Sequence, residues 1–142
     1  MTVRIKRVYD APSPSDGVRV LVDRLWPRGL TKEAAALDTW LKDVAPSHEL
    51  RRWYHAHPAQ WPKFRERYLA ELSTESAHAA FHTLHELARR KPGVALLFAS
   101  KSQEQNHALV LKQLLDGERK PPKGTGPSGA VAAGRARAAR RR

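Results

Sequence analysis

The segment Val94–Ala99 (VALLFA) constrains the fold more than any other part of the sequence. It is apolar throughout, and it lies between Gly93 and a polar stretch that begins at Ser100. Six apolar residues in this setting are typical of a strand that is covered on both faces, as in a parallel sheet. The sequence therefore predicts a buried strand at 94–99.

Three further segments are predicted to be strands. In Val3–Tyr9, apolar and basic residues alternate, and in Val18–Asp23 every second residue from Val18 to Val22 is a valine. Thr39–Val44 is predicted as a third, short strand that ends at Ala45-Pro46.

The other segments with recognisable signals are helical. They are Lys32–Ala36 capped by Thr31, a helix with Ser47 at its N-cap, a helix beginning at Pro58, the segment Ser76–Arg90, and a last helix opened by a Ser102/Gln105 capping box. The resulting order favours an α/β fold: a compact three-layer single domain with a small, mostly parallel sheet flanked by helices.

The net charge of +12 is unevenly distributed along the 142 residues. Residues 1–116 carry a net charge of +5, whereas residues 117–142 carry +7 and are rich in Gly, Ala, Pro and Arg. We expect residues 1–116 to form the domain and residues 117–142 to be disordered, because they have little apolar surface to bury. Such a tail either binds nucleic-acid phosphates or is a solvated extension.

Several functional classes are excluded or disfavoured by the residues present. The chain has no Cys, which rules out a disulfide scaffold and a thiol nucleophile. No apolar run approaches the roughly 18 residues needed to span a bilayer, and residues 1–9 do not form an export segment, so we expect a cytoplasmic protein without a membrane partner. Walker, Gly-x-Gly-x-x-Gly and Gly-x-Ser-x-Gly motifs are absent, and the sequence assigns no cofactor.

The candidate site residues follow predicted strands. In open α/β sheets, ligands collect at the carboxyl ends of the strands, so the loops after residues 22 and 99 are the places to examine. The candidates there are Asp23, Arg24, Trp26, Arg28, Ser100, Lys101, Asn106 and His107, with Lys42, Ser47 and Arg51 added by the third strand. This set is rich in cations and suits an anionic small molecule such as a nucleotide or phosphorylated metabolite.

Two interpretations of these residues are open. In the first, Arg24, Arg28 and Lys101 neutralise the anion, Asp23 or His107 moves a proton as a catalytic group, and Asn106 orients a carbonyl or amide. In the second, Asp23 forms an ion pair that ties the loop, His107 is a hydrogen-bonded helix residue, and the domain is a non-catalytic interaction module.

A histidine cluster on the third long helix is a separate candidate. His78, His82 and His85 share one face, and an i, i+4 pair of histidines can hold a metal ion. No third ligand completes a known pattern, and Glu86 and Arg89 lie on the same face, so we predict a solvated polar surface and no metal site.

Four sequence blocks resemble a known family. The blocks VRVLVDRLWPRGL, LDTWLKDVAPS, LRRWYHAHPAQWPKFRERYLAEL and LLFASKSQEQNHALVLKQLL are similar to the bacterial domain of unknown function 488 family, in its short YeaO-like branch. The resemblance covers nearly all of residues 1–116 and implies a compact three-layer α/β domain in which these blocks line one edge. The resemblance also implies that longer relatives in this family have a Cys after the last strand, at the position where this chain has Ser100. The resemblance implies no assigned activity and is not expected to reach the tail.

Overall fold

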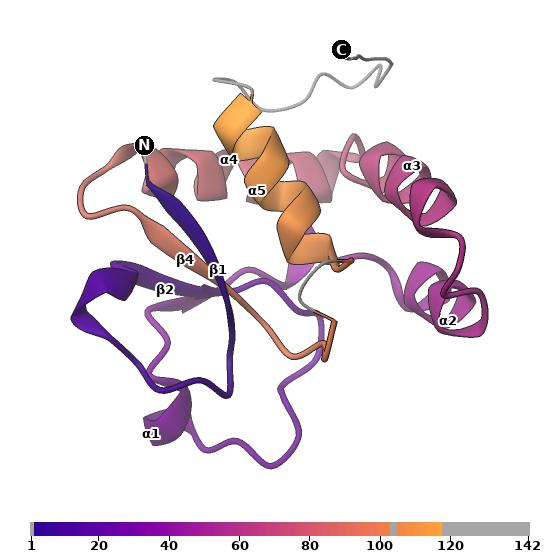
Figure 1. The fold of residues 1–142 in the computed structure, drawn as a ribbon. Helices are drawn as coiled ribbons and strands as arrows, with labels where there is room; N and C mark the ends of the chain where they lie inside the picture. The colour runs from indigo at the N-terminus through magenta and orange to yellow at the C-terminus, as the bar shows by residue number, and fades with distance from the viewer. Residues whose placement is uncertain (1, 103–104, 118–142) are drawn as a thin grey trace.

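The structure is a computed structural model that describes residues 2–102 and 105–117 (Figure 1). Its strands are β1 (Val3–Arg7), β2 (Val18–Leu21), β3 (Thr39–Trp40) and β4 (Val94–Phe98). Its α-helices are α1 (Lys32–Ala35), α2 (His48–Ala56), α3 (Trp61–Glu71), α4 (Glu75–Arg89) and α5 (His107–Gly117), and 3₁₀ turns lie at Pro14–Asp16 and Lys42–Val44. Of the tail predicted at residues 117–142, Gly117 belongs to α5, and the other residues lie outside the described part of the chain.

The four strands form one parallel sheet in the order β1-β4-β2-β3. β4 lies inside this sheet, since Val94 pairs with Val3 of β1 and with Val18 of β2. All five residues of β4 are buried, which confirms the strand predicted from the apolar run. β1 and β2 each end two residues before their predicted ends.

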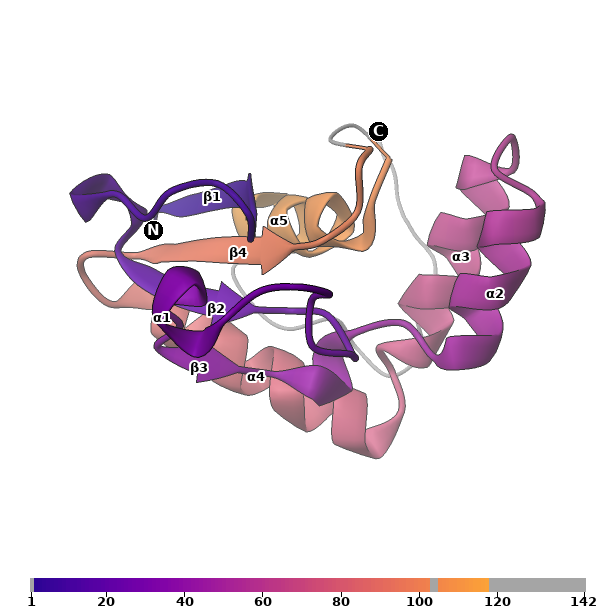
Figure 2. The same cartoon turned by 90° about the horizontal axis from the view of Figure 1, so that it is seen from below.

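The two faces of the sheet are covered differently. Side chains of β4 alternate, so that Leu96 and Phe98 pack on one face with residues of α3, α4 and α5, while Ala95 and Leu97 pack on the other with Ala35 of α1. Figure 2 shows α1 on one side of the sheet and α4 and α5 on the other. The α/β class predicted from the order of elements is confirmed.

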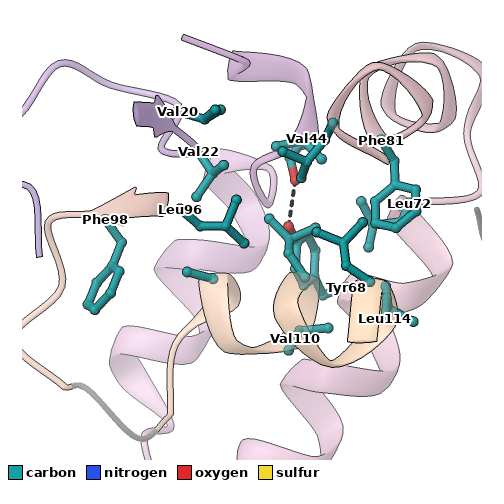
Figure 3. Close-up of a cluster of buried hydrophobic side chains, with 14 of the residues drawn as sticks. Val20, Val22, Val44, Tyr68, Leu72, Phe81, Leu96, Phe98, Val110 and Leu114 are labelled. Carbon is teal, nitrogen blue, oxygen red and sulfur yellow. Dashed lines mark hydrogen bonds between the residues drawn. The ribbon is translucent and has the colours of Figure 1, made fainter. Parts of the chain in front are cut away.

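The helices α2 and α3 lie beyond the carboxyl ends of the strands (Figure 2). They are anchored by Tyr68, which is fully buried among residues of β2, α4 and α5 and whose hydroxyl donates a hydrogen bond of 2.5 Å to the Val44 carbonyl (Figure 3). This arrangement places a helical pair opposite the loops that carry the predicted site residues.

Three further predicted boundaries are wrong by three or more residues. The third strand covers only Thr39–Trp40, because the chain turns into a 3₁₀ helix at Lys42. The helix predicted from Pro58 begins at Trp61, with Pro62 in its first turn. The last helix begins at His107 rather than after Ser102, since the side chain of Asn106 accepts a hydrogen bond of 2.9 Å from the backbone N–H of Leu109.

The predicted polar face of α4 is also wrong at one position. His82 is exposed and Arg89 pairs with Glu86 at 3.1 Å, as expected for a solvated face. His85, however, is only 5% exposed, and both of its ring nitrogens are buried without a hydrogen-bond partner among the described residues. A buried imidazole without partners costs folding free energy, because its polar atoms lose water and gain nothing.

The variant His85→Leu is therefore expected to be more stable than the wild-type protein. Removing the unpaired polar atoms adds about 1 kcal/mol to the free energy of unfolding, which for a domain of this size raises Tm by about 5 °C. Differential scanning calorimetry measures this shift, and His82→Leu on the exposed face is the matched control with an unchanged Tm. A lower Tm for His85→Leu would show that the imidazole is hydrogen-bonded in solution.

Candidate functional site

A cavity of about 860 Å³ opens at the carboxyl edge of the sheet. One part of its lining comes from the loops after β2 and β4, and the other from α2, α3 and the turn between them. The polar lining residues predicted from the sequence are Asp23, Arg24, Arg28, Arg51, Ser100, Lys101, Asn106 and His107, and Trp26 is also part of the lining. The loops after β2 and β4, where ligands are expected to collect in an open α/β sheet, therefore both line this cavity.

Asp23 and His107 are neighbours in this cavity, although they are far apart in the sequence. Nε2 of His107 lies 2.9 Å from the Val22 carbonyl and 3.0 Å from Oδ1 of Asp23. The other carboxylate oxygen of Asp23 accepts a hydrogen bond of 2.9 Å from the backbone N–H of Ala99. Both neighbours of Nε2 are acceptors, so this nitrogen carries the ring proton.

The two side chains of this pair differ in what they offer a ligand. Oδ1 of Asp23 receives no hydrogen bond from a described residue, but it is buried. Nδ1 of His107 has no hydrogen-bond partner in the described part of the chain, and in the neutral ring it is an acceptor. Nδ1 of His107 can therefore accept a hydrogen bond from a bound molecule.

The buried ring of Tyr68 packs against the His107 ring. The two rings meet edge to face, with centroids 6.2 Å apart. Burial raises the pKa of the Tyr68 phenol well above its usual value of 10.0, and the carboxylates of Glu71 and Asp23 raise it further. The phenol therefore stays neutral and keeps its bond to Val44.

The arginines and lysine of the cavity fall into two groups. Arg24, predicted to neutralise an anion, donates hydrogen bonds to the carbonyls of Pro46 at 3.2 Å and Ala45 at 2.9 Å, so it ties the β2 loop to the segment before α2. Arg28, Arg51 and Lys101 also line the cavity, and their charged side-chain groups form no hydrogen bond or ion pair with a described residue, although the Arg28 backbone carbonyl accepts a hydrogen bond from the Tyr9 hydroxyl. Three cations are thus available to a ligand.

Three further predicted site residues have structural contacts of their own. Lys42 lies outside the cavity lining, with its ammonium 4.3 Å from the centroid of the Trp40 ring, because the third strand ends before it. Ser47, also outside the lining, caps α2 and donates a hydrogen bond of 2.5 Å to Glu71. Asn106 lines the cavity but is 3% exposed and caps α5.

Trp26 and Ser100 line the cavity as predicted and also form local contacts. The indole N–H of Trp26 donates a hydrogen bond of 2.7 Å to the Leu30 carbonyl, and its ring meets Trp40 edge to face at 5.5 Å. Ser100 is exposed, and its hydroxyl oxygen accepts a hydrogen bond of 3.2 Å from the backbone N–H of Ser102. These contacts hold both loops in shape and do not close the cavity.

Of the lining residues that α2 and α3 contribute, the sequence interpretation predicted only Arg51. Tyr54, His55 and Phe64 reach the cavity, as do Tyr9 and Leu25. Burial raises the pKa of the Tyr54 phenol, so its hydroxyl remains a hydrogen-bond donor. The available signal was the spacing of Arg51 and Tyr54, which puts both on one face of a helix.

Two wider searches concern only the part of the chain that the structure describes. None of its helices is both long and apolar enough to cross a bilayer. None of its His, Asp and Glu side chains gather in a group of three or more that could hold a metal ion.

Comparison with known proteins gives the family. Residues 2–132 match the family described as the inactive DUF488-N3 subclade. The chain belongs to the DUF488 family. The resemblance suggested by the four sequence blocks is confirmed, although the DUF488 match runs past residue 116, where we expected it to end.

Two curated proteins are similar to this chain over most of their own length. The chain is 46% identical to "Uncharacterized protein YeaO" of Escherichia coli (strain K12) over 115 residues, which cover 81% of this chain and 97% of the relative. It is 45% identical over 115 residues to "Uncharacterized protein Rv3073c" of Mycobacterium tuberculosis (strain ATCC 25618 / H37Rv), covering 81% of this chain and 94% of that protein. No solved structure matches the chain.

Proposed function

We propose that this DUF488 domain binds an anionic small molecule, a nucleotide or phosphorylated metabolite, in the cavity at the carboxyl edge of the sheet. The observation that carries the proposal is the set of three cations, Arg28, Arg51 and Lys101, that line one cavity without a partner among the described residues. Uncompensated cations around a cavity raise the local concentration of anions and bind them by charge-assisted hydrogen bonds.

The chemistry of these side chains favours a phosphate group. Arg28 and Arg51 each present a planar guanidinium whose parallel N–H groups match two phosphate oxygens at once, while Lys101 adds a point charge. Asp23 is the carboxylate among the lining residues, and its single negative charge is outnumbered by the three cations.

We propose binding rather than turnover as the role of the site. The matching subclade is described as inactive, and the chain has no Cys to act as a nucleophile. In this proposal Asp23 orients His107, and Nδ1 of His107 accepts a hydrogen bond from a hydroxyl or N–H group of the ligand. The proton-transfer roles predicted for these two residues stay predictions.

The test is a titration of the full-length protein with ribose 5-phosphate, followed by NMR. The variants Arg28→Gln and Arg51→Gln are each expected to weaken binding by about tenfold, since one charge-assisted hydrogen bond is worth that much or more. Arg52→Gln is the matched control, because Arg52 is exposed on the same helix and lies outside the cavity lining.

The basic tail is unchanged in all three variants, so a loss of affinity in Arg28→Gln and Arg51→Gln alone would assign phosphate binding to the cavity rather than to the tail. Equal affinities for the wild type and both cavity variants would assign any phosphate binding to another part of the chain and refute the proposal. Absence of binding by the wild-type protein would refute it directly.

The alternative functions rest on other residues. Nucleic-acid binding was one of two alternatives left open for residues 117–142, and all of these except Gly117 lie outside the described residues. That alternative therefore stays a prediction based on charge alone. A non-catalytic interaction module is favoured by the structural contacts of Arg24 and Asn106, but such a role leaves the three unpaired cations without a function.

A further inference from the structure

The cavity has an apolar part that the proposed anion site does not explain. Two large hydrophobic residues in the described part of the chain are exposed to solvent. The exposed fraction is 42% for Tyr9 and 53% for Leu25. Both line the cavity, one from the turn after β1 and the other from the loop after β2. Exposed apolar surface gathered at a cavity indicates a ligand with apolar surface of its own.

Two separate parts of the chain supply the apolar lining. Leu25, Trp26 and Pro27 come from the loop after β2, and Tyr54 and Phe64 come from α2 and α3. The Tyr54 ring stacks on Phe64 with centroids 4.4 Å apart, and Phe64 stacks in turn on Tyr68 at 5.9 Å. This row of rings runs from the cavity into the core, so the Tyr54 ring is held in place from behind.

Each apolar part carries a cation three residues away. Arg28 follows Leu25 in the loop, and Arg51 precedes Tyr54 on α2. On a helix, side chains at this spacing are neighbours, with Cβ atoms about 5–6 Å apart. The cavity therefore offers an apolar ring surface and an anion site within one small molecule's length of each other.

We infer that the ligand joins a planar aromatic ring to a phosphate, as a nucleoside monophosphate does, and that Tyr54 and Leu25 select the ring. This inference rests on the proposed function, because the cations must hold the phosphate for the ring to be placed. Every nucleobase has an apolar face that can stack on an aromatic side chain. Tyr54 therefore binds the ring without distinguishing one base from another.

The experiment compares two probes on the full-length protein: AMP, which has the ring, and ribose 5-phosphate, which lacks it. The wild-type protein is expected to bind AMP at least tenfold more tightly, since stacking of one base on an aromatic side chain contributes a factor of this size. Phenyl phosphate is titrated in parallel. Affinity near that of AMP would show that any aryl phosphate is accepted, and weaker binding that the nucleoside is preferred.

Two variants locate the ring site. Tyr54→Ala is expected to remove most of the preference for AMP and to leave the affinity for ribose 5-phosphate unchanged. Tyr54 packs on Phe64, so Tyr54→Ala can also affect folding. The separate single variant Leu25→Ser avoids this problem, because the Leu25 side chain is half exposed and lies outside the core. Leu25→Ser is expected to lower the affinity for AMP by about threefold, with Tm unchanged.

The outcomes separate this inference from the proposed function. Equal affinities of the wild-type protein for AMP and ribose 5-phosphate would overturn the ring site and leave the anion site standing. Binding of neither probe would overturn both. A preference for AMP that survives both Tyr54→Ala and Leu25→Ser would overturn the assignment of the ring to this part of the cavity.

Discussion

The variant Gly93→Ala is expected to lose about 4 kcal/mol of folding free energy, a large part of the stability of a domain of this size. Gly93 has a φ of +93°, a conformation that alanine adopts only under strain. A Cβ atom at this position would lie 2.5 Å from the carbonyl oxygen and 2.8 Å from the Cβ of Thr2. The first of these contacts is with backbone, so the chain itself must shift.

The position of Gly93 makes such a shift costly. Its carbonyl accepts a hydrogen bond of 3.0 Å from the N–H of Val18, and the next residue, Val94, donates one of 3.0 Å to the Thr2 carbonyl. Gly93 therefore lies where β4 meets both of its neighbours, and a displacement weakens the pairing of three strands at once. Steric overlap and backbone strain each cost roughly 1–3 kcal/mol in such sites, and here both apply.

Urea unfolding of the full-length protein measures the effect, and Gly29→Ala is the matched control. Gly29 also has a positive φ, of +74°, but a Cβ there would meet no atom within 4 Å. Only backbone strain applies, so a loss of about 1 kcal/mol is expected. Similar losses for the two variants would show that the close approach of Thr2 to Gly93 does not carry the effect.

The elements that could be predicted from the sequence are those that the local pattern specifies. Val94–Phe98 needs no partner to be recognised as a buried strand, because every residue is apolar. β3 is different, since Thr39 and Trp40 are a strand only through pairing with Val20 and Leu21. The sequence of residues 39–44 has no signal for the position at which the pairing with β2 ends, so the predicted strand was too long.

Helix starts show the same limit. Ser47 was correctly predicted as an N-cap, and its hydroxyl accepts the Leu50 N–H at 3.1 Å. Ser102 carries an equally good signal, and it does accept a hydrogen bond of 3.1 Å from the Gln105 N–H, yet α5 begins after Asn106. Two capping residues four positions apart compete, and the packing of the helix decides between them.

The candidate site was predicted in part for an equally physical reason. β2 and β4 are parallel neighbours, so the loops that follow them start at one edge of the sheet, and this rule led to the prediction that Asp23 and His107 share that edge. The role of Arg24 did not, because its hydrogen bonds go to carbonyls of a segment that the fold brings beside it. Arg24 and Arg28 look alike in the sequence, and only the structure distinguishes the arginine that ties a loop from the one that is unpaired.

Asp16→Asn is the second variant with a large expected effect. It removes the carboxylate that forms ion pairs with Lys6 and Arg19. The Asp16 side chain is 3% exposed and lies 2.6 Å from Nη1 of Arg19 and 3.0 Å from Nζ of Lys6. Arg19 is itself buried and donates further hydrogen bonds to the carbonyls of Ala35 and Ala36. Removing the carboxylate leaves a buried guanidinium without its counter-ion, which costs about 3–5 kcal/mol.

The cost of Asp16→Asn is expected to depend on pH. Burial raises the pKa of Asp16, but hydrogen bonds from the Ser13 N–H, Lys6 and Arg19 outweigh burial and bring it below the usual value of 3.8. A carboxyl with a lowered pKa in the folded state stabilises the fold above its unfolded-state pKa, and that stability is lost as the pH falls through the folded-state value. The difference in unfolding free energy between wild type and Asp16→Asn should therefore be full at neutral pH and shrink below about pH 4.

Urea unfolding at neutral pH and at successively lower pH values measures this difference. Asp10→Asn is the matched control, because Asp10 is exposed and forms no side-chain hydrogen bond or ion pair with a described residue, so its effect stays small throughout. A difference for Asp16→Asn that is the same at every pH would mean that the charge of Asp16 contributes nothing and that only its shape matters. In that case Arg19 would be held by the carbonyls of Ala35 and Ala36 alone, and the fold would tolerate an uncompensated cation at its centre.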